Sequence, residues 1–539
     1  MTHPRNSMSK IMSATDAIAL IPDGCTLGVT GTGPALEPDL LLATLEQRFL
    51  TEGRPGALSL FLPMLPGDRK GEGGLNSFAH KGMMRQVMGA SFSRARHPAF
   101  LDIMETGEVE GYITGMGTMI QILTATGSGK PGVVTKVGLG TFIDPRHGGG
   151  AMNAASVSPP VRLIEIEGEE MLFYPAQKID VALIRGTTAD ENGYVSFEEE
   201  TNTLGAVEMA LACKASGGTV IVQVKRVARA GSLDPRTVRI PGPLIDAIVV
   251  HPAQTQLSPM MADPAHGWNP FLAGALKRPL DDIRPLPLSA EKALLRRAAL
   301  ELREGDVINL GAGVATRLPI VALEEGILDR VTFTNEHGIF GGLMATAVGG
   351  SFVPAFNADA IMDSVFQFNF YDGGGLDVTF LGIGQVDGSG NLNVSRFGAE
   401  VNGPGGFINI TSKTRRIVFC GTLTSGGLRS RIDEGRLRIE QEGRFGKFVP
   451  RVEEVTFNAA EARARGQEVL YITDRAVFRL GETGPELIEI APGIDLDRDI
   501  RSRVGFELAV SPRLSVMAEA LFREPLLGLA SSLPKGDRA

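Results

Sequence analysis

The sequence predicts an α/β protein of two homologous open domains, each with a mainly parallel sheet covered by helices. Short β-branched runs bounded by glycine or basic residues, such as 220–222 and 416–419, are typical of buried strands. Residues 38–49 and 290–303 carry apolar side chains at helical spacing. Strands that alternate with helices favour parallel sheets with both faces covered.

An internal duplication supports the prediction of two similar domains. Residues 179–193 and 376–390 carry the same pattern, an apolar-Asp-Val triplet followed by aspartate and glycine at identical spacing. The same offset superposes the apolar run 220–222 on 417–419. We therefore expect two copies of one α/β unit.

The length of 539 residues exceeds what a single hydrophobic core usually reaches. The proline-rich stretch 270–287 can continue neither a helix nor a central strand, so it is predicted to be the linker. We place the boundary within this stretch, which gives an N-terminal domain of residues 1–284 and a C-terminal domain of residues 285–539.

Composition excludes several classes of partner. The net charge of −9 offers no basic stripe for a phosphate backbone, so no nucleic acid partner is expected. No run of about 18 apolar residues occurs, so we expect a soluble chain without a membrane partner. Cys25, Cys213 and Cys420 lie far apart without a CxxC pair, which indicates a reducing, cytoplasmic compartment.

Common catalytic signatures are missing from the sequence. There is no HExxH and no GxSxG, and Gly129-Lys130 is followed by proline where a P-loop requires serine or threonine. The 7 histidines are scattered, so no metal site is expected.

Glu336 is the most informative side chain. It follows the strand-like run 331–334 and precedes His337 and Gly338, so a carboxylate is predicted where a strand ends in a flexible loop. Open α/β sheets collect their ligands at the carboxyl ends of strands, and glycine lets the backbone approach a ligand closely. The alternative is a solvated glutamate near the start of a helix.

Two more glycine-dense loops, 371–377 and 402–407, lie in the same half, and the second contains Gly403, Gly405 and Gly406. Backbone N–H groups of such loops can converge on an oxyanion, which acyl transfer through a tetrahedral intermediate requires. The alternative for each loop taken singly is a tight turn.

The chain resembles a known enzyme family at these positions. Glu336 and the runs 368–377, 391–398 and 405–410 are similar to family I CoA-transferases of the acetate, propionate and 3-oxoacid type, in their fused form. In the first half the match is carried by 129–132, 135–142 and 196–198. The resemblance covers about residues 20 to 525. It implies the CoA-transferase (NagB/RpiA-like) fold, with the acyl side in the first domain and the catalytic glutamate in the second.

The resemblance also implies a mechanism. In such enzymes the glutamate that matches Glu336 attacks an acyl-CoA, and the resulting anhydride becomes a glutamyl-CoA thioester that a second carboxylate then reverses. This is ping-pong covalent catalysis. Gly338, Gly403, Gly405 and Gly406 are then candidates for the loops that bind CoA and the oxyanion. The partners are a small acyl-CoA and a carboxylate, with CoA as substrate and no permanently bound cofactor.

The sequence departs from the family at the acyl site. A Pro-Gln-Gly tripeptide is common there, and this chain has Gly115-Met116-Gly117, so Met116 replaces an amide donor with an apolar side chain. Met116, Gly117 and His337 are therefore the acyl-site candidates. Basic residues considered for the CoA phosphates are Lys413, Arg415, Arg416, Arg429 and Lys447.

Three other functions remain open at the level of sequence. An acyl-CoA hydrolase would use water in place of the acceptor acid, and the missing amide favours it slightly. A non-catalytic sensor of acyl-CoA or a phosphorylated metabolite is compatible with the same fold. A transferase subunit that acts on a carrier protein is the third. A homo-oligomer is expected from the resemblance and from the apolar tail after Ser511.

Overall fold

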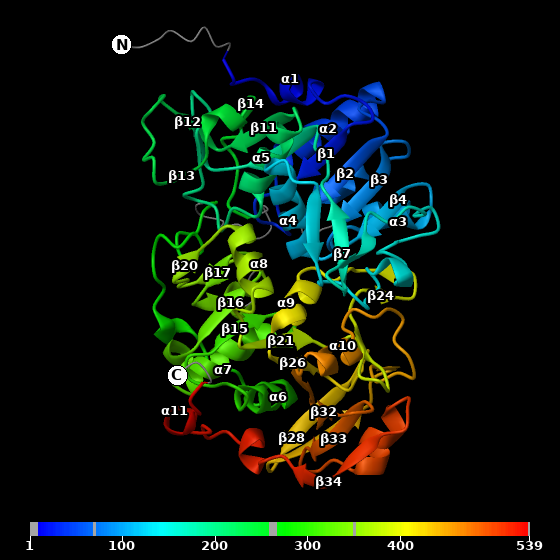
Figure 1. The fold of residues 1–539 in the computed structure, drawn as a ribbon. Helices are drawn as coiled ribbons and strands as arrows, with labels where there is room; N and C mark the ends of the chain where they lie inside the picture. The colour runs from blue at the N-terminus through cyan, green and yellow to red at the C-terminus, as the bar shows by residue number, and fades with distance from the viewer. Residues whose placement is uncertain (1–8, 68–71, 258–266, 349–351, 537–539) are drawn as a thin grey trace.

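The structure is a computed structural model that describes residues 9–67, 72–257, 267–348 and 352–536. Figure 1 shows the N-terminal half, blue to green, stacked on the C-terminal half, green to red. Each half is built on one large sheet with helices around it. The predicted α/β class with two similar, mainly parallel units is confirmed.

The N-terminal half contains a seven-stranded sheet that is parallel throughout. In spatial order its strands are β14 (Ala247–Val250), β11 (Thr219–Val224), β8 (Val181–Arg185), β1 (Thr26–Val29), β2 (Leu58–Leu62), β3 (Met84–Gly89) and β4 (Glu110–Ile113). Its helices are α1 (Ala14–Ala19), α2 (Asp39–Glu52), α3 (Pro98–Glu105), α4 (Met116–Gly127) and α5 (Ala206–Ala215).

The C-terminal half contains a ten-stranded sheet. In spatial order its strands are β20 (Ala360–Ile361), β17 (Ile339–Phe340), β16 (Thr332–Asn335), β15 (Val307–Leu310), β21 (Val378–Gly382), β26 (Arg416–Gly421), β31 (Glu468–Thr473), β32 (Ala476–Leu480), β33 (Pro485–Ile490) and β34 (Ala509–Val516). The run from β16 to β31 is parallel. Its helices are α6 (Ala290–Ala299), α7 (Leu318–Glu324), α8 (Ser364–Asp372), α9 (Phe407–Lys413), α10 (Ala459–Ala464) and α11 (Leu529–Ser532).

Both halves also contain smaller sheets. In the first half they are β5 (Gly132–Thr135), β6 (Arg162–Ile166) and β7 (Glu169–Pro175), and β9 (Thr188–Asp190), β10 (Val195–Ser196), β12 (Arg226–Ala228) and β13 (Val238–Ile240). In the second half they are the pairs β18 (Leu343–Met344) with β19 (Ala355–Phe356), β22 (Gln385–Val386) with β23 (Leu392–Asn393), β24 (Arg396–Phe397) with β25 (Glu400–Val401), β27 (Thr424–Ser425) with β30 (Phe445–Gly446), and β28 (Arg429–Asp433) with β29 (Arg436–Gln441).

The duplication seen in the sequence is a duplication of topology. The strand order β14-β11-β8-β1-β2 in the first sheet repeats as β31-β26-β21-β15-β16 in the second, with every pairing parallel. The repeated Asp-Val step opens β8 at Val181 and β21 at Val378. The aspartates match in function as well, because Asp180 and Asp377 each accept the N–H of the neighbouring strand, from Thr26 and Val307.

The strands of the two large sheets lie within residues 26–250 and 307–516. The domain boundary that we propose after residue 284 falls between these ranges. The proline-rich segment before it is packed rather than loose, since Leu272, Ile283 and Leu286 are buried. Lys292 on α6 donates to the Leu286 carbonyl at 2.6 Å, which ties the end of this segment to the second half.

None of the helices within the described ranges combines the length and the apolar character needed to span a bilayer. The cysteines Cys25, Cys213 and Cys420 are buried, and their thiols form no disulfide.

Candidate active site

A cavity of about 300 Å³ lies between the two halves. This volume is at the lower end of the range typical of small-molecule sites. The first half contributes Thr32, Ser91, Phe92, Arg96 and Met116 to its wall. The second half contributes the remaining residues, which are Gly311, Ala312, Glu336, His337, Phe352, Leu381, Gly382, Val394, Asn402, Gly403, Pro404, Gly405, Gly406, Phe407 and Ile410.

The cavity lies where the carboxyl ends of parallel strands from both sheets meet. Thr32 follows β1 and Ser91 follows β3, while Gly311 follows β15 and Glu336 follows β16. Ligands of open α/β sheets collect at this end of the strands. The duplication therefore places two such edges against one another, and the cavity is the space between them.

The Glu336 side chain is buried, with 8% of its surface exposed. Its Oε2 atom has no hydrogen-bond partner among the described residues. Burial raises the pKa of this carboxyl to about 7, and the nearby Asn309 amide lowers it in part. The residues that follow lead into β17 rather than a helix, so the alternative of a solvated glutamate at a helix start is wrong.

Polar side chains beneath Glu336 form a network that sequence reasoning missed. Asn309 on β15 donates to the Tyr371 hydroxyl at 3.2 Å and accepts from Thr379 at 3.1 Å. The hydroxyls of Thr334 and Tyr371 are 2.7 Å apart. Because these partners fix the Asn309 amide, the amide is held in place to face the carboxylate. A signal was available, since Asn309 stands two residues before a glycine loop at a strand end.

His337 also lines the cavity and is almost fully buried. Burial, together with the charge of Arg96, lowers the pKa of its imidazole to about 3, so the ring is neutral near pH 7. The ring meets the edge of Phe352 at a centroid distance of 5.5 Å. Its backbone carbonyl accepts from Asn202 of the first half at 2.8 Å. His337 thus supplies an uncharged wall and a tie between the halves.

Gly338 does not line the cavity, but it determines the path of the loop that follows Glu336. Its φ of 94° favours glycine, and a Cβ atom there would lie 2.1 Å from the Met362 carbonyl oxygen. The Gly338 carbonyl accepts from the Met362 N–H at 2.8 Å. A side chain at this position would therefore displace the loop that carries the carboxylate.

The three glycines of loop 402–407 reach the cavity, and they use their N–H groups differently. Gly403 donates to the Ser395 carbonyl and Gly405 to the Ala90 carbonyl, each at 3.0 Å. The Gly406 N–H donates to no other described residue, and a Cβ on Gly406 would lie 3.4 Å from Glu336 Cβ and Cγ. Gly406 is therefore the glycine whose N–H is available beside the carboxylate.

Met116 and Gly117 begin α4, and only Met116 lines the cavity. The Met116 N–H donates to the Gly405 carbonyl at 2.8 Å, which joins α4 to the glycine loop of the other half. A Cβ atom on Gly117 would lie 2.4 Å from Phe368 Cδ1 and 2.7 Å from Asn409. Gly117 thus allows α4 to pack closely on α8 and α9, a role that the sequence did not indicate.

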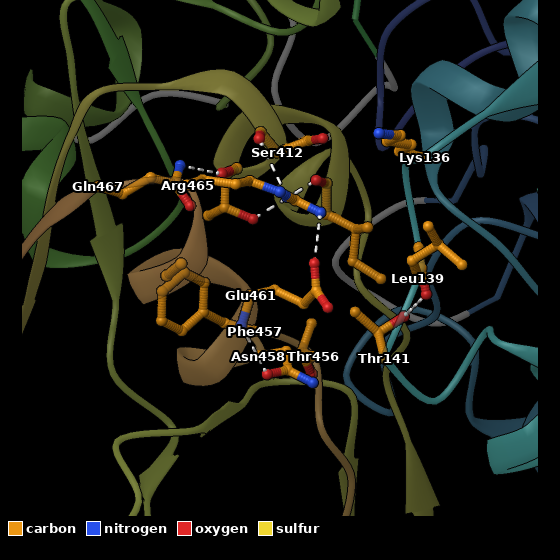
Figure 2. Close-up of a pocket in the computed structure, with 14 residues that line it drawn as sticks. Lys136, Leu139, Thr141, Ser412, Thr456, Phe457, Asn458, Glu461, Arg465 and Gln467 are labelled. Atoms are coloured by element: carbon orange, nitrogen blue, oxygen red, sulfur yellow. Dashed lines mark hydrogen bonds and ion pairs between the residues drawn. The ribbon is translucent and has the colours of Figure 1, made fainter. Parts of the chain in front are cut away.

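A second, much smaller cavity lies between the halves (Figure 2). Figure 2 shows Lys136, Leu139 and Thr141 of the first half facing residues near α9 and α10 of the second. The cavity of about 20 Å³ is large enough for about one water molecule. Asn458 donates to the Gly140 carbonyl at 2.8 Å, so this place joins the two halves.

Two of the basic residues considered for the CoA phosphates are engaged inside the protein. Arg416 is buried and lies 2.5 Å from Asp306, and it also donates to the Glu301 carbonyl. Lys447 donates to the Ile383 carbonyl at 3.0 Å, and burial lowers its pKa. No group of three or more metal-ligating side chains is present in the part of the chain that the structure describes.

Comparison with known proteins assigns the chain to a family. Residues 11–251 match the coenzyme A transferase family model. Acetate CoA-transferase YdiF of Escherichia coli (strain K12) is 39% identical over 97% of this chain and 97% of its own length. Caffeate CoA-transferase of Acetobacterium woodii is 40% identical over 98% of this chain and 100% of its own length.

The chain belongs to the coenzyme A transferase family. A crystal structure of acyl-CoA transferase YdiF from Escherichia coli O157:H7, a thioester complex with CoA, is similar to this CoA-transferase with a TM-score of 0.90 and 38% identity. The match covers 99% of this chain and 100% of that chain. This CoA-transferase therefore moves CoA between acyl-CoA thioesters and carboxylic acids, with CoA as a substrate.

The burial of the Glu336 carboxyl in this CoA-transferase leads to a prediction about how stability depends on pH. Between pH 4.5 and about pH 7 the folded protein keeps a proton on Glu336 that an unfolded chain has released, so stability falls as pH rises through this window. The full penalty, about 3 kcal/mol, is present above pH 7. Glu336→Gln removes the charge, so its melting temperature should exceed that of the wild type at about pH 8.

The same comparison at about pH 4.5 should show little difference, since both proteins are then uncharged at this position. Glu482→Gln, which changes an exposed glutamate between β32 and β33, is the matched control and should shift the melting temperature at neither pH. A Glu336→Gln protein that is less stable than the wild type at about pH 8 would contradict the desolvated carboxylate.

Proposed function

We propose that Glu336 carries CoA as a covalent thioester in a ping-pong exchange between short-chain acyl-CoA and free acids of the acetate, propionate or 3-oxoacid class. The observation that carries the proposal is the buried Glu336 carboxylate, whose Oε2 has no partner among the described residues, in a cavity walled by both halves. A carboxylate that water does not solvate is a stronger nucleophile than an exposed one.

The exchange takes place in four steps. The ionised Glu336 attacks the acyl carbonyl, and the carbon–sulfur bond breaks to give an acyl-glutamyl anhydride and CoA thiolate. The thiolate attacks the glutamyl carbonyl, which releases the first acid and leaves glutamyl-CoA. A second carboxylate then attacks this thioester, and the returning thiolate takes the new acyl group. The covalent intermediate divides one difficult exchange into two easier half-reactions.

The surroundings of Glu336 suit these steps. With a pKa of about 7 the carboxyl is substantially ionised near neutral pH, as a nucleophile requires. The Gly406 N–H, beside Glu336, is the donor that we propose for the oxyanion of the tetrahedral intermediates. The neutral His337 and the apolar Met116 and Phe352 keep water from the anhydride.

Trapping the thioester tests this proposal. The protein is incubated with acetyl-CoA or butyryl-CoA without an acceptor acid and is examined by intact-mass and peptide mass spectrometry. We expect a CoA adduct on the peptide that contains Glu336, and we expect none in Glu336→Gln, where the amide is not nucleophilic. Addition of acetate should discharge the adduct.

Other outcomes select the alternatives. Free CoA that accumulates without an acceptor and without an adduct would identify an acyl-CoA hydrolase. Discharge that requires a second protein would identify a transferase subunit that serves a carrier protein. Binding of acyl-CoA with neither adduct nor turnover would overturn the proposal altogether.

We also propose that the chain forms a homo-oligomer. β34 ends the ten-stranded sheet and pairs with β33 alone among the described strands, so it presents a free edge. Such edges template pairing with another chain. Val516 on β34 and Leu526 beyond it are exposed at 62% and 60%.

Light scattering coupled to size-exclusion chromatography checks the oligomer. We expect a mass of two or more chains for the wild type and a lower mass for Val516→Lys, because a charge on the edge opposes pairing. A monomer at all concentrations would contradict this proposal and leave the covalent mechanism untouched.

A further inference from the structure

Three helices that pack together where the halves meet each contribute to the surroundings of Glu336. α4 of the first half packs on α8 and α9 of the second (Figure 1). α4 begins at Met116, which lines the cavity, and α9 begins directly after Gly406, beside Glu336. α8 carries Tyr371, whose hydroxyl belongs to the polar network beneath Glu336. The placement of these helices relative to one another therefore determines the environment of the carboxylate.

The Asp372 carboxylate joins all three helices. Asp372 is the last residue of α8 and directly follows Tyr371. Its Oδ2 atom accepts from Gln121 Nε2 on α4 at 2.8 Å, and both of its carboxylate oxygens lie 3.2 Å from Asn409 Nδ2 on α9. The Gln121 amide also donates to Asn369 of α8 at 3.2 Å. One carboxylate thus receives a donor from each of the two helices that pack on α8.

The bonds to Asp372 also fix the direction in which the buried Asn409 amide faces. Because Asn409 Nδ2 is turned towards the carboxylate, its Oδ1 lies against the start of α4, where a Cβ atom on Gly115 would be 2.5 Å away. A Cβ atom on Gly117 would lie 2.7 Å from Asn409 Nδ2. The Asn409 side chain therefore fills the space beside the first turn of α4, next to Met116. A shift of Asn409 would move this turn, and with it the cavity wall that Met116 forms.

The negative charge of Asp372 suits this arrangement. Two amide NH2 groups from different helices can donate to one carboxylate, whereas a carboxamide offers one acceptor oxygen and an NH2 group that would face a donor. Burial raises the pKa of Asp372 to about 6, and the bonds from Gln121 and Asn409 and the charge of Lys413 lower it in part. The carboxyl is therefore mostly ionised at neutral pH, and hydrogen bonds to an ionised group are stronger than those between neutral groups.

We propose that Asp372 is a positioning residue for CoA transfer, which fixes α4 and α9 on α8 and thereby places Met116 and Gly406 around Glu336. Asp372 does not line the cavity, so it acts through these helices and not by contact with the substrate. The inference rests on the proposal that the chemistry takes place at Glu336. A displacement of about 1 Å can lower the rate of an enzymatic step by about 100-fold. Loss of the Asp372 carboxylate should therefore affect kcat more than KM.

An exchange of donor and acceptor between α4 and α8 tests the assignment. With butyryl-CoA as donor and acetate as acceptor, Asp372→Asn should lower kcat by about 10- to 100-fold at a nearly unchanged KM, because its NH2 group faces a second donor. The double variant Gln121→Glu/Asp372→Asn moves the carboxylate to α4, where it accepts from the amide at position 372, and the oxygen of that amide accepts from Asn409. The double variant should therefore regain most of the wild-type kcat.

Another bond between the halves provides the matched control. Asn458→Ala removes the hydrogen bond to the Gly140 carbonyl, so it should lower the melting temperature and keep the wild-type kcat. A wild-type kcat in Asp372→Asn, or a folded double variant that regains no kcat, would overturn the assignment. If Asp372→Asn does not fold, Gln121→Leu, which removes one donor and keeps the charge, replaces it. A lowered kcat in that variant supports the assignment, and a wild-type kcat overturns it.

The CoA adduct separates this inference from the proposed mechanism. Adduct formation on Glu336 in the wild type, measured before any acceptor is added, reports the covalent step and not the role of Asp372. Where the adduct forms, its rate in Asp372→Asn should fall by the same factor as kcat, and an unchanged rate would overturn the positioning role. Recovery of kcat in the double variant of a protein that forms no adduct would reject the covalent step alone and support the positioning role.

Discussion

The burial of one carboxylate is the constraint on which the rest of the site depends. Glu336 lies at the end of β16 with 8% of its surface exposed, and its raised pKa corresponds to about 3 kcal/mol that the fold must offset above neutral pH. No single loop could impose this cost, because an isolated loop would let water reach the side chain. The carboxylate stays buried because two sheets meet over it and because hydrogen bonds join the halves around it.

Those joining contacts converge on the loops that surround Glu336. The N–H of Met116 donates to the Gly405 carbonyl, and the Asn202 amide donates to the His337 carbonyl, so two residues of the first half hold two loops of the second. Glycine is required at Gly338, where a Cβ would lie 2.1 Å from the Met362 carbonyl oxygen, whereas a Cβ on Gly406 would lie at ordinary contact distance, 3.4 Å, from Glu336. Access of a substrate to the carboxylate and the exclusion of water are thus determined by the same interface.

Patterns local in sequence were sufficient for the fold and for part of the site. Repetition and strand-like runs predicted two matching sheets, and the position of Glu336 between a strand and glycines predicted a carboxylate at a strand end. Asn309 and Tyr371 were missed because their importance comes from contacts between segments far apart in the chain. Gly117 was assigned to the acyl pocket, yet its position against Phe368 depends on how α4 packs on α8, which no local pattern records.

The protonation state of Glu336 itself is the most direct test of this account. Infrared difference spectra between wild type and Glu336→Gln, recorded from about pH 4 to about pH 9, follow the protonated carboxyl band of this one side chain. The account predicts a band that persists to neutral pH and is half lost at about pH 7. A midpoint near 4.5, the ordinary value for glutamate, would show that water reaches the carboxylate and would contradict the account.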